Sequence, residues 1–299
     1  MKVISYRRRD HTESVGVLRE DLHGAFDLIR AIETYAAARG ECRPPVLDML
    51  DLLDEEMLDV QLLKRIEAFV EDHGLLEELQ EIDYTVLAPI ARPRAIYALG
   101  RNYPAHAAES GADVPDEPIV FGKAPTAVIG PDENVVYKKW LTRVDPEAEL
   151  AVVIGKGGAD IAEADAVSHI AGYTILNDVT ARDLQSKDMG KAHPWLRSKG
   201  IDTFCPMGPN ITLTDEITHP IELAVEMRVN GEVRQKDNTS SLTFSVPYLI
   251  SCISRYHTLY PGDVISTGTP EGMKPVVPGD VMEARVERIG VLRNTVVAE

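Results

Sequence analysis

Cysteine is scarce in this chain, and positive charge is outweighed by negative charge. The 299 residues include three cysteines, Cys42, Cys205 and Cys252, which lie far apart and form no Cys-x-x-Cys pair. This pattern excludes a disulfide framework or a zinc–thiolate site and indicates reduced thiols, as in the cytoplasm. With 31 basic against 48 acidic residues, the net charge is −17. That balance argues against a nucleic-acid-binding protein, although a local site for an anion stays open.

Long apolar runs are also missing. No run of about 18 apolar residues is present, so we expect no membrane-spanning segment. The first ten residues, MKVISYRRRD, lack the apolar core of a signal peptide. We therefore expect a cytoplasmic protein that binds neither membranes nor nucleic acid. The hydrophobic content of 44% and charged content of 26% are ordinary for a globular protein of one large domain or two.

The sequence changes character at about residues 85–95. Met1–Tyr6 reads as a short strand, and helical periodicity with acidic polar faces follows in 17–40, 44–57 and 60–82. Strands and turns dominate after Ala95, with candidate strands at 95–100, 127–130, 149–155, 170–178, 222–231, 263–268 and 281–290. Helices are expected there only after Asn102, near 162–169 and at 246–254.

Strands and helices do not alternate in the second part, which argues against a doubly wound sheet. The sequence predicts an α+β, β-rich fold. We expect a smaller, mainly helical accessory domain over residues 1–90 and a catalytic domain over residues 91–299.

Two acidic residues lie at the start of the most apolar of these predicted strands. In VDPEAELAVVIGK, Glu147 and Glu149 are two apart, so on a strand their side chains point to the same face. The run Leu-Ala-Val-Val-Ile that follows is typical of a strand buried on both faces. Two like charges beside a core are unfavourable unless they are neutralised, and a bound cation would do so. Two solvated glutamates at the start of a strand are the alternative.

A third carboxylate ends the next apolar strand. In AGYTILNDVTARDLQ, Asp178 follows Asn177 at the end of the strand. A helix cap is the simpler interpretation of such an aspartate. Together with Glu147 and Glu149, it would instead complete an all-oxygen site suited to Mg²⁺ or Mn²⁺ in octahedral geometry. Water positions left open there would admit a chelating substrate.

Three further segments carry polar groups suited to catalysis. In GRNYPAHAAESG, His106 and Glu109 share one face of a helix, where a carboxylate could raise the basicity of the imidazole. Lys199 could stabilise developing negative charge. The segment DVISTGTPEGM reads as a strand followed by a loop. Such a loop could bind a carboxylate through the Thr269 hydroxyl and backbone N–H groups. A surface helix turn, a solvated lysine and an ordinary turn are the respective alternatives.

Seven segments, taken in order, resemble the fumarylacetoacetate hydrolase (FAH) family. They are GRNYPAHAAE, EPIVFGKAPTAVIGP, DPEAELAVVIGK, AGYTILNDVTARDLQ, PWLRSKGIDTFCPMGP, VNGEVRQKDNTSSLTFSVPYLISCIS and LYPGDVISTGTPEGM. The resemblance covers residues 95 to the end. It implies mixed sheets rolled around a metal site and a homodimer.

The resemblance also implies roles for individual residues. Glu147, Glu149 and Asp178 fall on the ligands of the metal, and His106 with Glu109 falls on the pair that activates water. Arg182, Gln185 and Lys199 match supporting polar residues, and Thr269 matches the loop that binds the substrate carboxylate. We accordingly predict Lys199 to act with the water-activating pair, and Arg182, Gln185 and Thr269 to bind substrate.

These roles suit a small-molecule 2-oxo or 2,4-dioxo acid that reacts through a metal-bound enolate. Hydrolysis of a C–C bond in an acylpyruvate-like acid is the leading prediction, because His106 and Glu109 are both present. Decarboxylation or isomerisation of oxaloacetate or 2-hydroxymuconate-type diacids, or a ureidoglycolate-type lyase reaction, stays open. A non-catalytic metabolite-binding protein is a further alternative.

Overall fold

Two neighbouring strands at the centre of the molecule are buried on both faces. The strand β11 (Ala148–Ile154) is buried along its whole length and pairs antiparallel with β12 (Ile170–Asn177). Side chains alternate as a strand requires: Leu150, Val152 and Ile154 enter one hydrophobic core, and Ala151 and Val153 enter another. Both faces of this strand pair are therefore covered by other elements.

The computed structural model describes residues 1–19 and 24–299, and its strands form two large sheets and a small one. The larger sheet has the order β4-β3-β2-β1-β14-β12-β11-β17-β6-β7. Its strands besides β11 and β12 are β1 (Lys2–Arg8), β2 (Glu13–Arg19), β3 (Gly24–Asp27), β4 (Gln80–Glu81), β6 (Ile96–Gly100), β7 (Ile119–Gly122), β14 (Cys205–Leu213) and β17 (Val264–Ser266). The short strands β5 (Tyr84–Val86) and β8 (Val128–Ile129) pair with β1 and β14.

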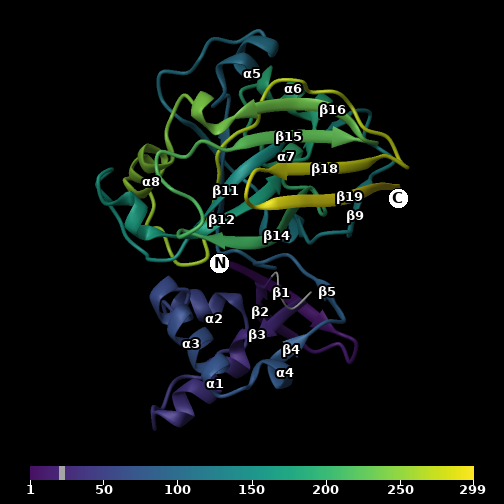
Figure 1. Cartoon of the computed structure of the whole chain (residues 1–299). Coiled ribbons are helices and arrows are strands. Elements are labelled where there is room, and N and C mark those ends of the chain that lie inside the picture. Colours follow the sequence, from purple (N-terminus) through teal and green to yellow (C-terminus); the bar gives the residue numbers. More distant parts are fainter. Residues whose placement is uncertain (20–23) are drawn as a thin grey trace.

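The second sheet packs over one face of β11 and β12. Its order is β16-β15-β18-β19-β9, formed by β16 (Glu232–Asn238), β15 (Ala224–Val229), β18 (Val281–Val286), β19 (Gly290–Ala298) and β9 (Asn134–Tyr137). Figure 1 shows β15, β18 and β19 running across β11 and β12. Met227 and Met282 from this sheet share the core of Leu150 and Val152. Burial of these apolar faces against each other is the main force that holds the two sheets together.

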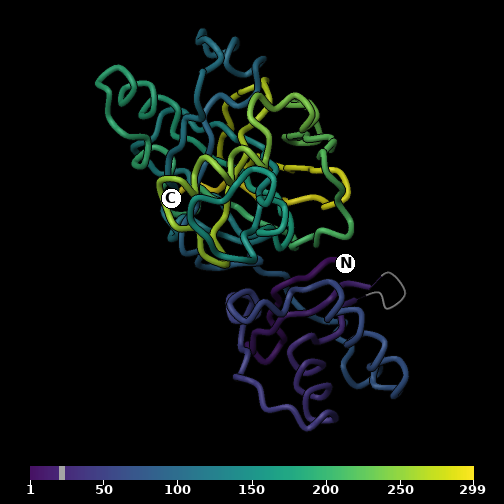
Figure 2. Tube along the Cα trace, turned by 90° about the vertical axis from the view of Figure 1, so that its left-hand side faces the viewer, coloured from purple at the N-terminus to yellow at the C-terminus, as the bar shows by residue number. Residues whose placement is uncertain are grey.

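Four helices and the first strands lie below this sandwich in Figure 1. The helices are α1 (Leu28–Ala38), α2 (Met49–Asp54), α3 (Val60–Asp72) and α4 (Leu76–Leu79). Because β1 pairs antiparallel with β14, the larger sheet continues from the upper part into the lower part. Ile32, Leu52 and Ile66 of the helices join Val153 in one core. Figure 2 shows the N-terminus at the junction, where the Met1 ammonium lies 2.8 Å from carboxylate oxygens of Asp215 and Glu216.

Short helices flank the sandwich and carry the loops of the candidate site. They are α5 (Pro104–Glu109), α6 (Arg182–Met189), α7 (Leu196–Lys199) and α8 (Val246–Ser254). Proline begins α5, where its missing N–H costs no helical hydrogen bond. Ser245 caps α8 by accepting a hydrogen bond from the Tyr248 N–H at 3.3 Å. A ribbon of β10 (Val144–Asp145) and β13 (Thr180–Ala181) joins the segments before β11 and after β12.

The α+β, β-rich prediction is confirmed, but the helix expected over 17–40 is wrong in its first half. Residues Glu13–Arg19 and Gly24–Asp27 are strands, and the helix begins only at Leu28, where the Asp27 side chain accepts a hydrogen bond from the Arg30 N–H. The predicted helix also crosses residues 20–23, which lie outside the described residues. The helix expected near 162–169 is a short 3₁₀ turn, Ala166–His169, and the helix at 246–254 is confirmed.

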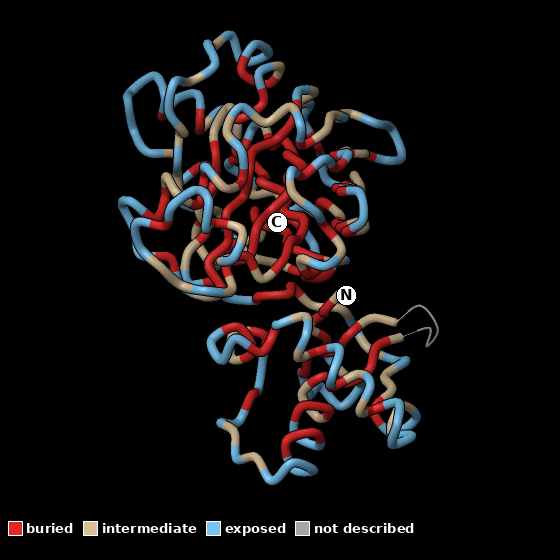
Figure 3. The backbone as a smooth tube through the Cα atoms, turned by 60° about the vertical axis from the view of Figure 1, so that its left-hand side comes forward, coloured by how far each residue is buried: buried red, intermediate tan, exposed pale blue. Residues whose placement is uncertain are grey.

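Buried backbone is concentrated in the middle of the sandwich, and exposed loops surround it (Figure 3). The three cysteines are free thiols, with Cys42 exposed and Cys205 buried. No helix in residues 1–19 or 24–299 combines the length and the apolar character that crossing a membrane demands.

Candidate active site

Strand pairing brings three carboxylates together at one end of β11 and β12. Glu147 directly precedes β11, Glu149 lies within it, and Asp178 directly follows β12. The Asp178 N–H donates to the Glu147 carbonyl at 2.8 Å, and the Asn177 side chain accepts from the Glu147 N–H at 2.9 Å. Carboxylate oxygens of Glu147, Glu149 and Asp178 lie within 4.8 Å of one another, and all three residues are buried.

Two buried lysines lie against this cluster. Lys199 Nζ, at the end of α7, is 2.7 Å from Glu147 Oε2 and also binds Asp178 Oδ2. Lys123 Nζ is 2.5 Å from Asp178 Oδ1 and 2.5 Å from the Lys199 carbonyl. Burial would lower the pKa of Lys199, but Asp178 and Glu147 outweigh burial and raise it, so the ammonium stays charged.

Arg182, at the start of α6, donates hydrogen bonds to Glu147 of the cluster and to two neighbouring side chains. Its Nε donates to Asp145 Oδ2 at 2.8 Å, its Nη1 donates to Gln185 Oε1 at 2.7 Å, and its Nη2 donates to Glu147 Oε1. All three nitrogens of the guanidinium are therefore engaged by protein groups. Arg182 thus anchors Glu147 and Gln185 in this structure, and its predicted role in substrate binding stays a prediction.

The carboxylates differ in their pKa because their partners differ. Burial would raise the pKa of Glu147, but the charges of Lys199 and Arg182 outweigh it and lower that pKa. Glu149 receives hydrogen bonds from the Ser266 hydroxyl and, at 2.8 Å, from the Gly268 N–H. Burial and then the charges of Asp178 and Glu147 nevertheless raise its pKa well above the ordinary value.

A divalent cation fits this donor set. Lys123 and Lys199 supply two positive charges against three carboxylates, while Arg182 is shared with Asp145. Glu149 makes no ion pair among the described residues, and burial together with the charges of Asp178 and Glu147 raises its pKa. Clustered carboxylate oxygens suit a hard cation, and Glu147 of this cluster lines a cavity.

His106 lies in the cavity beside the cluster, but it is not hydrogen-bonded to Glu109. The distance from His106 Nδ1 to Glu109 Oε2 is 3.8 Å, and Nδ1 is buried without a hydrogen-bond partner among the described residues. Burial lowers the pKa of His106, so the imidazole is neutral at pH 7. Glu109 instead accepts hydrogen bonds from the N–H groups of Gly272, at 3.0 Å, and Met273, at 3.2 Å.

Thr269 and Gln185 also line the cavity. The Thr269 hydroxyl donates to the Ala148 carbonyl at 3.0 Å and accepts from Gln235 Nε2 at 2.9 Å. Gln235 also accepts from the Ala148 N–H at 3.0 Å, so it joins β16 to the first residue of β11. The structure thus brings every predicted site residue to one cavity or directly beside it.

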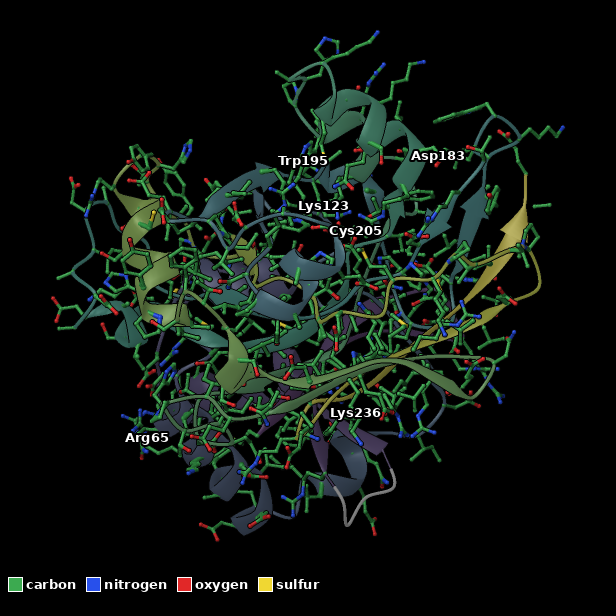
Figure 4. The ribbon with its side chains drawn as sticks, turned by 90° about the horizontal axis from the view of Figure 1, so that it is seen from above. Arg65, Lys123, Asp183, Trp195, Cys205 and Lys236 are labelled. Atoms are coloured by element: carbon green, nitrogen blue, oxygen red, sulfur yellow. The ribbon has the colours of Figure 1, made fainter. Side chains whose placement is uncertain are left out.

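Part of the cavity wall is aromatic. Phe121 and Trp195 stack in a tilted arrangement with ring centroids 5.1 Å apart, and Lys199 Nζ lies 5.2 Å from the centroid of Phe121. Figure 4 labels Trp195, Lys123 and Cys205 in the same region of the molecule. Burial raises the pKa of the Cys205 thiol to about 12, which keeps it protonated and unreactive. The cavity volume is about 60 Å³, so this wall leaves little room beside the carboxylates.

Several residues of the site are absent from the sequence-based expectations. Lys123, Asp145, Gln235, Ser266 and Arg101 were not singled out. A lysine directly after the apolar run IVFG was the available signal for Lys123. The others are single polar residues whose spacing carries no pattern.

Residues 95–297 match the family model of the C-terminal domain of fumarylacetoacetate (FAA) hydrolase. The chain belongs to the fumarylacetoacetate hydrolase family. FAH-family proteins are enzymes that act on small molecules, and those similar to this chain include hydrolases, isomerases and tautomerases. The resemblance noted in the sequence is therefore confirmed.

Two curated proteins illustrate the similarity of this chain to known sequences. An uncharacterized protein of Pyrococcus abyssi is 49% identical over 208 residues, which is 70% of this chain and 92% of that protein. A mitochondrial oxaloacetate tautomerase, FAHD2A of Bos taurus, is 44% identical over 229 residues, which is 74% of this chain and 72% of that protein.

Solved FAH-family structures match the whole chain. The fumarylacetoacetate hydrolase of Exiguobacterium antarcticum superposes with a TM-score of 0.79 at 30% identity, covering 100% of both chains. A 5-carboxymethyl-2-hydroxymuconate delta-isomerase from Mycobacterium smegmatis gives a TM-score of 0.74 at 33% identity, covering 100% of this chain and 99% of that one.

Proposed function

We propose that this protein is a Mg²⁺- or Mn²⁺-dependent tautomerase of short 2-oxo acids, which moves a proton between the keto and enol forms. The observation that carries this proposal is the buried, unpaired His106 beside the three-carboxylate cluster. A neutral imidazole next to a cation site suits proton transfer at the carbon beside a carbonyl. The similarity to oxaloacetate tautomerases supports the same reaction.

Each residue has a part in this reaction. Glu147, Glu149 and Asp178 would hold the cation, which supplies a Lewis acid that favours the enolate. His106, neutral at pH 7, takes the proton from C3 of the keto acid and delivers it to the enolate oxygen, which gives the enol; ketonisation is the reverse transfer. Lys199 adds positive charge beside the developing oxyanion, and Gln185, fixed by Arg182, orients the acid.

C–C bond hydrolysis, the leading prediction from the sequence, is the second candidate. It is supported by the position of Glu109 on the same turn of α5 as His106. In this reaction His106, assisted by Glu109, would deprotonate a water molecule that attacks the distal carbonyl. Glu109 would have to leave the N–H groups of Gly272 and Met273 to reach His106, so hydrolysis needs a rearrangement that tautomerisation does not.

The test is a turnover panel of enol oxaloacetate and acetylpyruvate with Mg²⁺, Mn²⁺ or EDTA. We expect metal-dependent ketonisation, abolished in Glu149→Gln, which keeps the size of the side chain and removes its charge. Release of acetate from acetylpyruvate would instead favour the hydrolase. No metal-dependent turnover of either acid, in protein that binds Mn²⁺ by calorimetry, would refute both reactions for these acids.

The homodimer and the cytoplasmic location stay predictions. Light scattering of the purified protein measures the first, and a mass equal to one chain would contradict it.

A further inference from the structure

The cavity beside the carboxylate cluster is lined by three cationic side chains: Arg101, Arg182 and Lys199. An anionic substrate with two carboxylates needs a cation at each end, because burying an unpaired carboxylate is costly. Which of the three can still bind a substrate therefore decides what kind of acid the cavity accepts.

Two of the three are already committed to protein carboxylates. Arg182 uses its three nitrogens on Asp145, Gln185 and Glu147. Lys199 Nζ bridges Glu147 and Asp178. Both groups therefore lie at the carboxylate cluster, where the 2-oxo acid end of the substrate would bind, and they are poorly placed for a carboxylate at its other end.

Arg101 is the exception among the described residues that line the cavity. It is half-buried, and its guanidinium makes no hydrogen bond or ion pair within residues 1–19 and 24–299. Arginine binds carboxylates through two parallel hydrogen bonds, so a guanidinium without a protein partner at a cavity wall is suited to a ligand carboxylate.

The backbone holds Arg101 in an unusual conformation. Its φ is +58°, in the left-handed region that is costly for a residue with a side chain and is common at binding sites. The neighbouring residues are tied down on both sides. Trp195 packs so closely on Gly100 that a Cβ there would lie 2.7 Å from the ring. The Asn102 amide donates to the Thr267 carbonyl at 2.8 Å and accepts from the Phe244 N–H at 2.8 Å.

The remaining wall gives a distal carboxylate no other charged partner. Phe121, Trp195, Met189 and Met273 are apolar or aromatic there, and Ser110 is neutral. The cavity of about 60 Å³ also favours a short acid over a long one. Arg101 is thus the group in the described cavity wall that can neutralise the far end of a short substrate.

We propose that Arg101 binds the distal carboxylate of a short 2-oxo dicarboxylate and so selects diacids over monoacids of the same shape. This inference rests on the proposed function, in which the 2-oxo acid end lies at the carboxylate cluster. Arg101 is a specificity residue in this scheme, and the proton transfer itself is left to His106.

Oxaloacetate and acetylpyruvate form a matched pair for the test, because the second replaces the distal carboxylate oxygen anion by a methyl group. We expect Arg101→Met to lower kcat/KM for oxaloacetate relative to kcat/KM for acetylpyruvate by about 10- to 100-fold, the usual effect of a hydrogen-bonded charge pair. Arg101→Lys should restore part of the ratio, because it keeps the charge and loses the two-pronged geometry. Arg65→Met is the matched control, since Arg65 is exposed on α3, far from Lys123 and Trp195 in Figure 4.

Binding separates this inference from the proposed reaction. In the presence of Mg²⁺, the melting temperature should rise more with oxaloacetate than with acetylpyruvate, and Arg101→Met should remove that difference. If the wild type turned over both acids and Arg101→Met left their ratio unchanged, the role of Arg101 would be refuted and the tautomerase would stand. If neither acid were turned over but the melting difference followed Arg101, the reaction would be wrong and the diacid site would stand.

Discussion

At the scale of single residues, the chemistry of the site depends on which polar groups have protein partners and which do not. Ion pairs join four of the charged side chains into one network, formed by Glu147, Asp178, Lys199 and Arg182. Because each charge in it has a partner of opposite sign, this network forms a fixed frame. His106 Nδ1 stands apart from this frame as a buried atom without a partner in the described residues. Buried polar atoms normally have partners, and exceptions are typical of functional sites.

A pH profile tests the role of His106. Burial lowers the pKa of His106, and the positive charges of Arg182 and Lys199 act in the same direction. The base form is the neutral one, so activity should be present above this pKa and lost as the pH falls through it. We expect the acid limb of kcat/KM to have its midpoint below 6.5, the ordinary value for histidine.

In the His106→Asn protein, kcat/KM should no longer show this fall at low pH, and kcat should be about 10²- to 10⁴-fold lower than in the wild type. His11→Asn is the control, because His11 is exposed and its φ of +69° is one that asparagine tolerates. An acid limb that persisted unchanged in the His106→Asn protein would assign the titration to another group.

Single residues also mark where sequence reasoning was sufficient and where it was not. Glu147 and Glu149 were predicted to lie on one face because alternation on a strand is a local rule, and Asp178 joined them because it ends the next strand. Lys123 and Arg101 were missed, because a basic residue without a periodic or paired neighbour looks like any solvated residue. Their importance arises from tertiary contacts that no short stretch of sequence encodes.

At the scale of elements, the loop after β17 connects the site to the second sheet. Gly272 lies in this loop with a φ of +105°, and a Cβ there would lie 1.9 Å from the Arg234 carbonyl on β16. The same loop supplies the N–H groups that hold Glu109. Its close approach to β16 therefore fixes the position of α5 relative to the cluster.

Gly272→Ala tests this connection. The added methyl must push the loop away from β16, so we expect Glu109 to lose its partners and the metal-dependent kcat/KM to fall at least tenfold. Gly279→Ala is the matched control, since its φ of +100° imposes the same backbone strain while a Cβ there meets nothing within 4 Å. Equal losses in the two proteins would show that strain alone, and no displacement of the loop, causes the effect.

The elements of the second part were predicted more successfully than those of the first. Helical periodicity was assigned over residues 17–40, whereas the structure has strands up to Asp27. Pairing of β2 with β1 and of β3 with β2 supplies backbone hydrogen bonds that outweigh the local preference. The strand β14 was not expected, because its prolines and glycine are poor strand formers, yet it links the two parts of the larger sheet.

At the scale of the whole molecule, the first 90 residues and the remainder share one core. Val153, Ile211, Leu213 and Val264 belong to the sandwich, but they pack in the same cluster as residues of α1, α2 and α3. The paired strands β1 and β14 cross the same boundary. The two predicted domains are therefore joined by packing and by backbone hydrogen bonds.

Removing residues 1–90 should consequently destabilise the catalytic part. The deletion exposes an apolar face and leaves the edge of β14 unpaired, both of which promote aggregation. We expect a lower midpoint of unfolding in urea than that of the full chain, together with aggregation in light scattering. A truncated protein with an unchanged midpoint and full Mn²⁺ binding would show that the first 90 residues are dispensable for stability.

The burial of β11 on both faces has a consequence for how this sequence can vary. Since side chains alternate, inserting one residue between Glu149 and Leu150 would turn the two sides of the strand over relative to each other. Either Glu149 would then point away from Glu147 and Asp178, or Leu150, Val152 and Ile154 would leave the hydrophobic core between the sheets. Insertions and deletions are therefore not tolerated within this strand, and related sequences can differ in length only in the exposed loops around it.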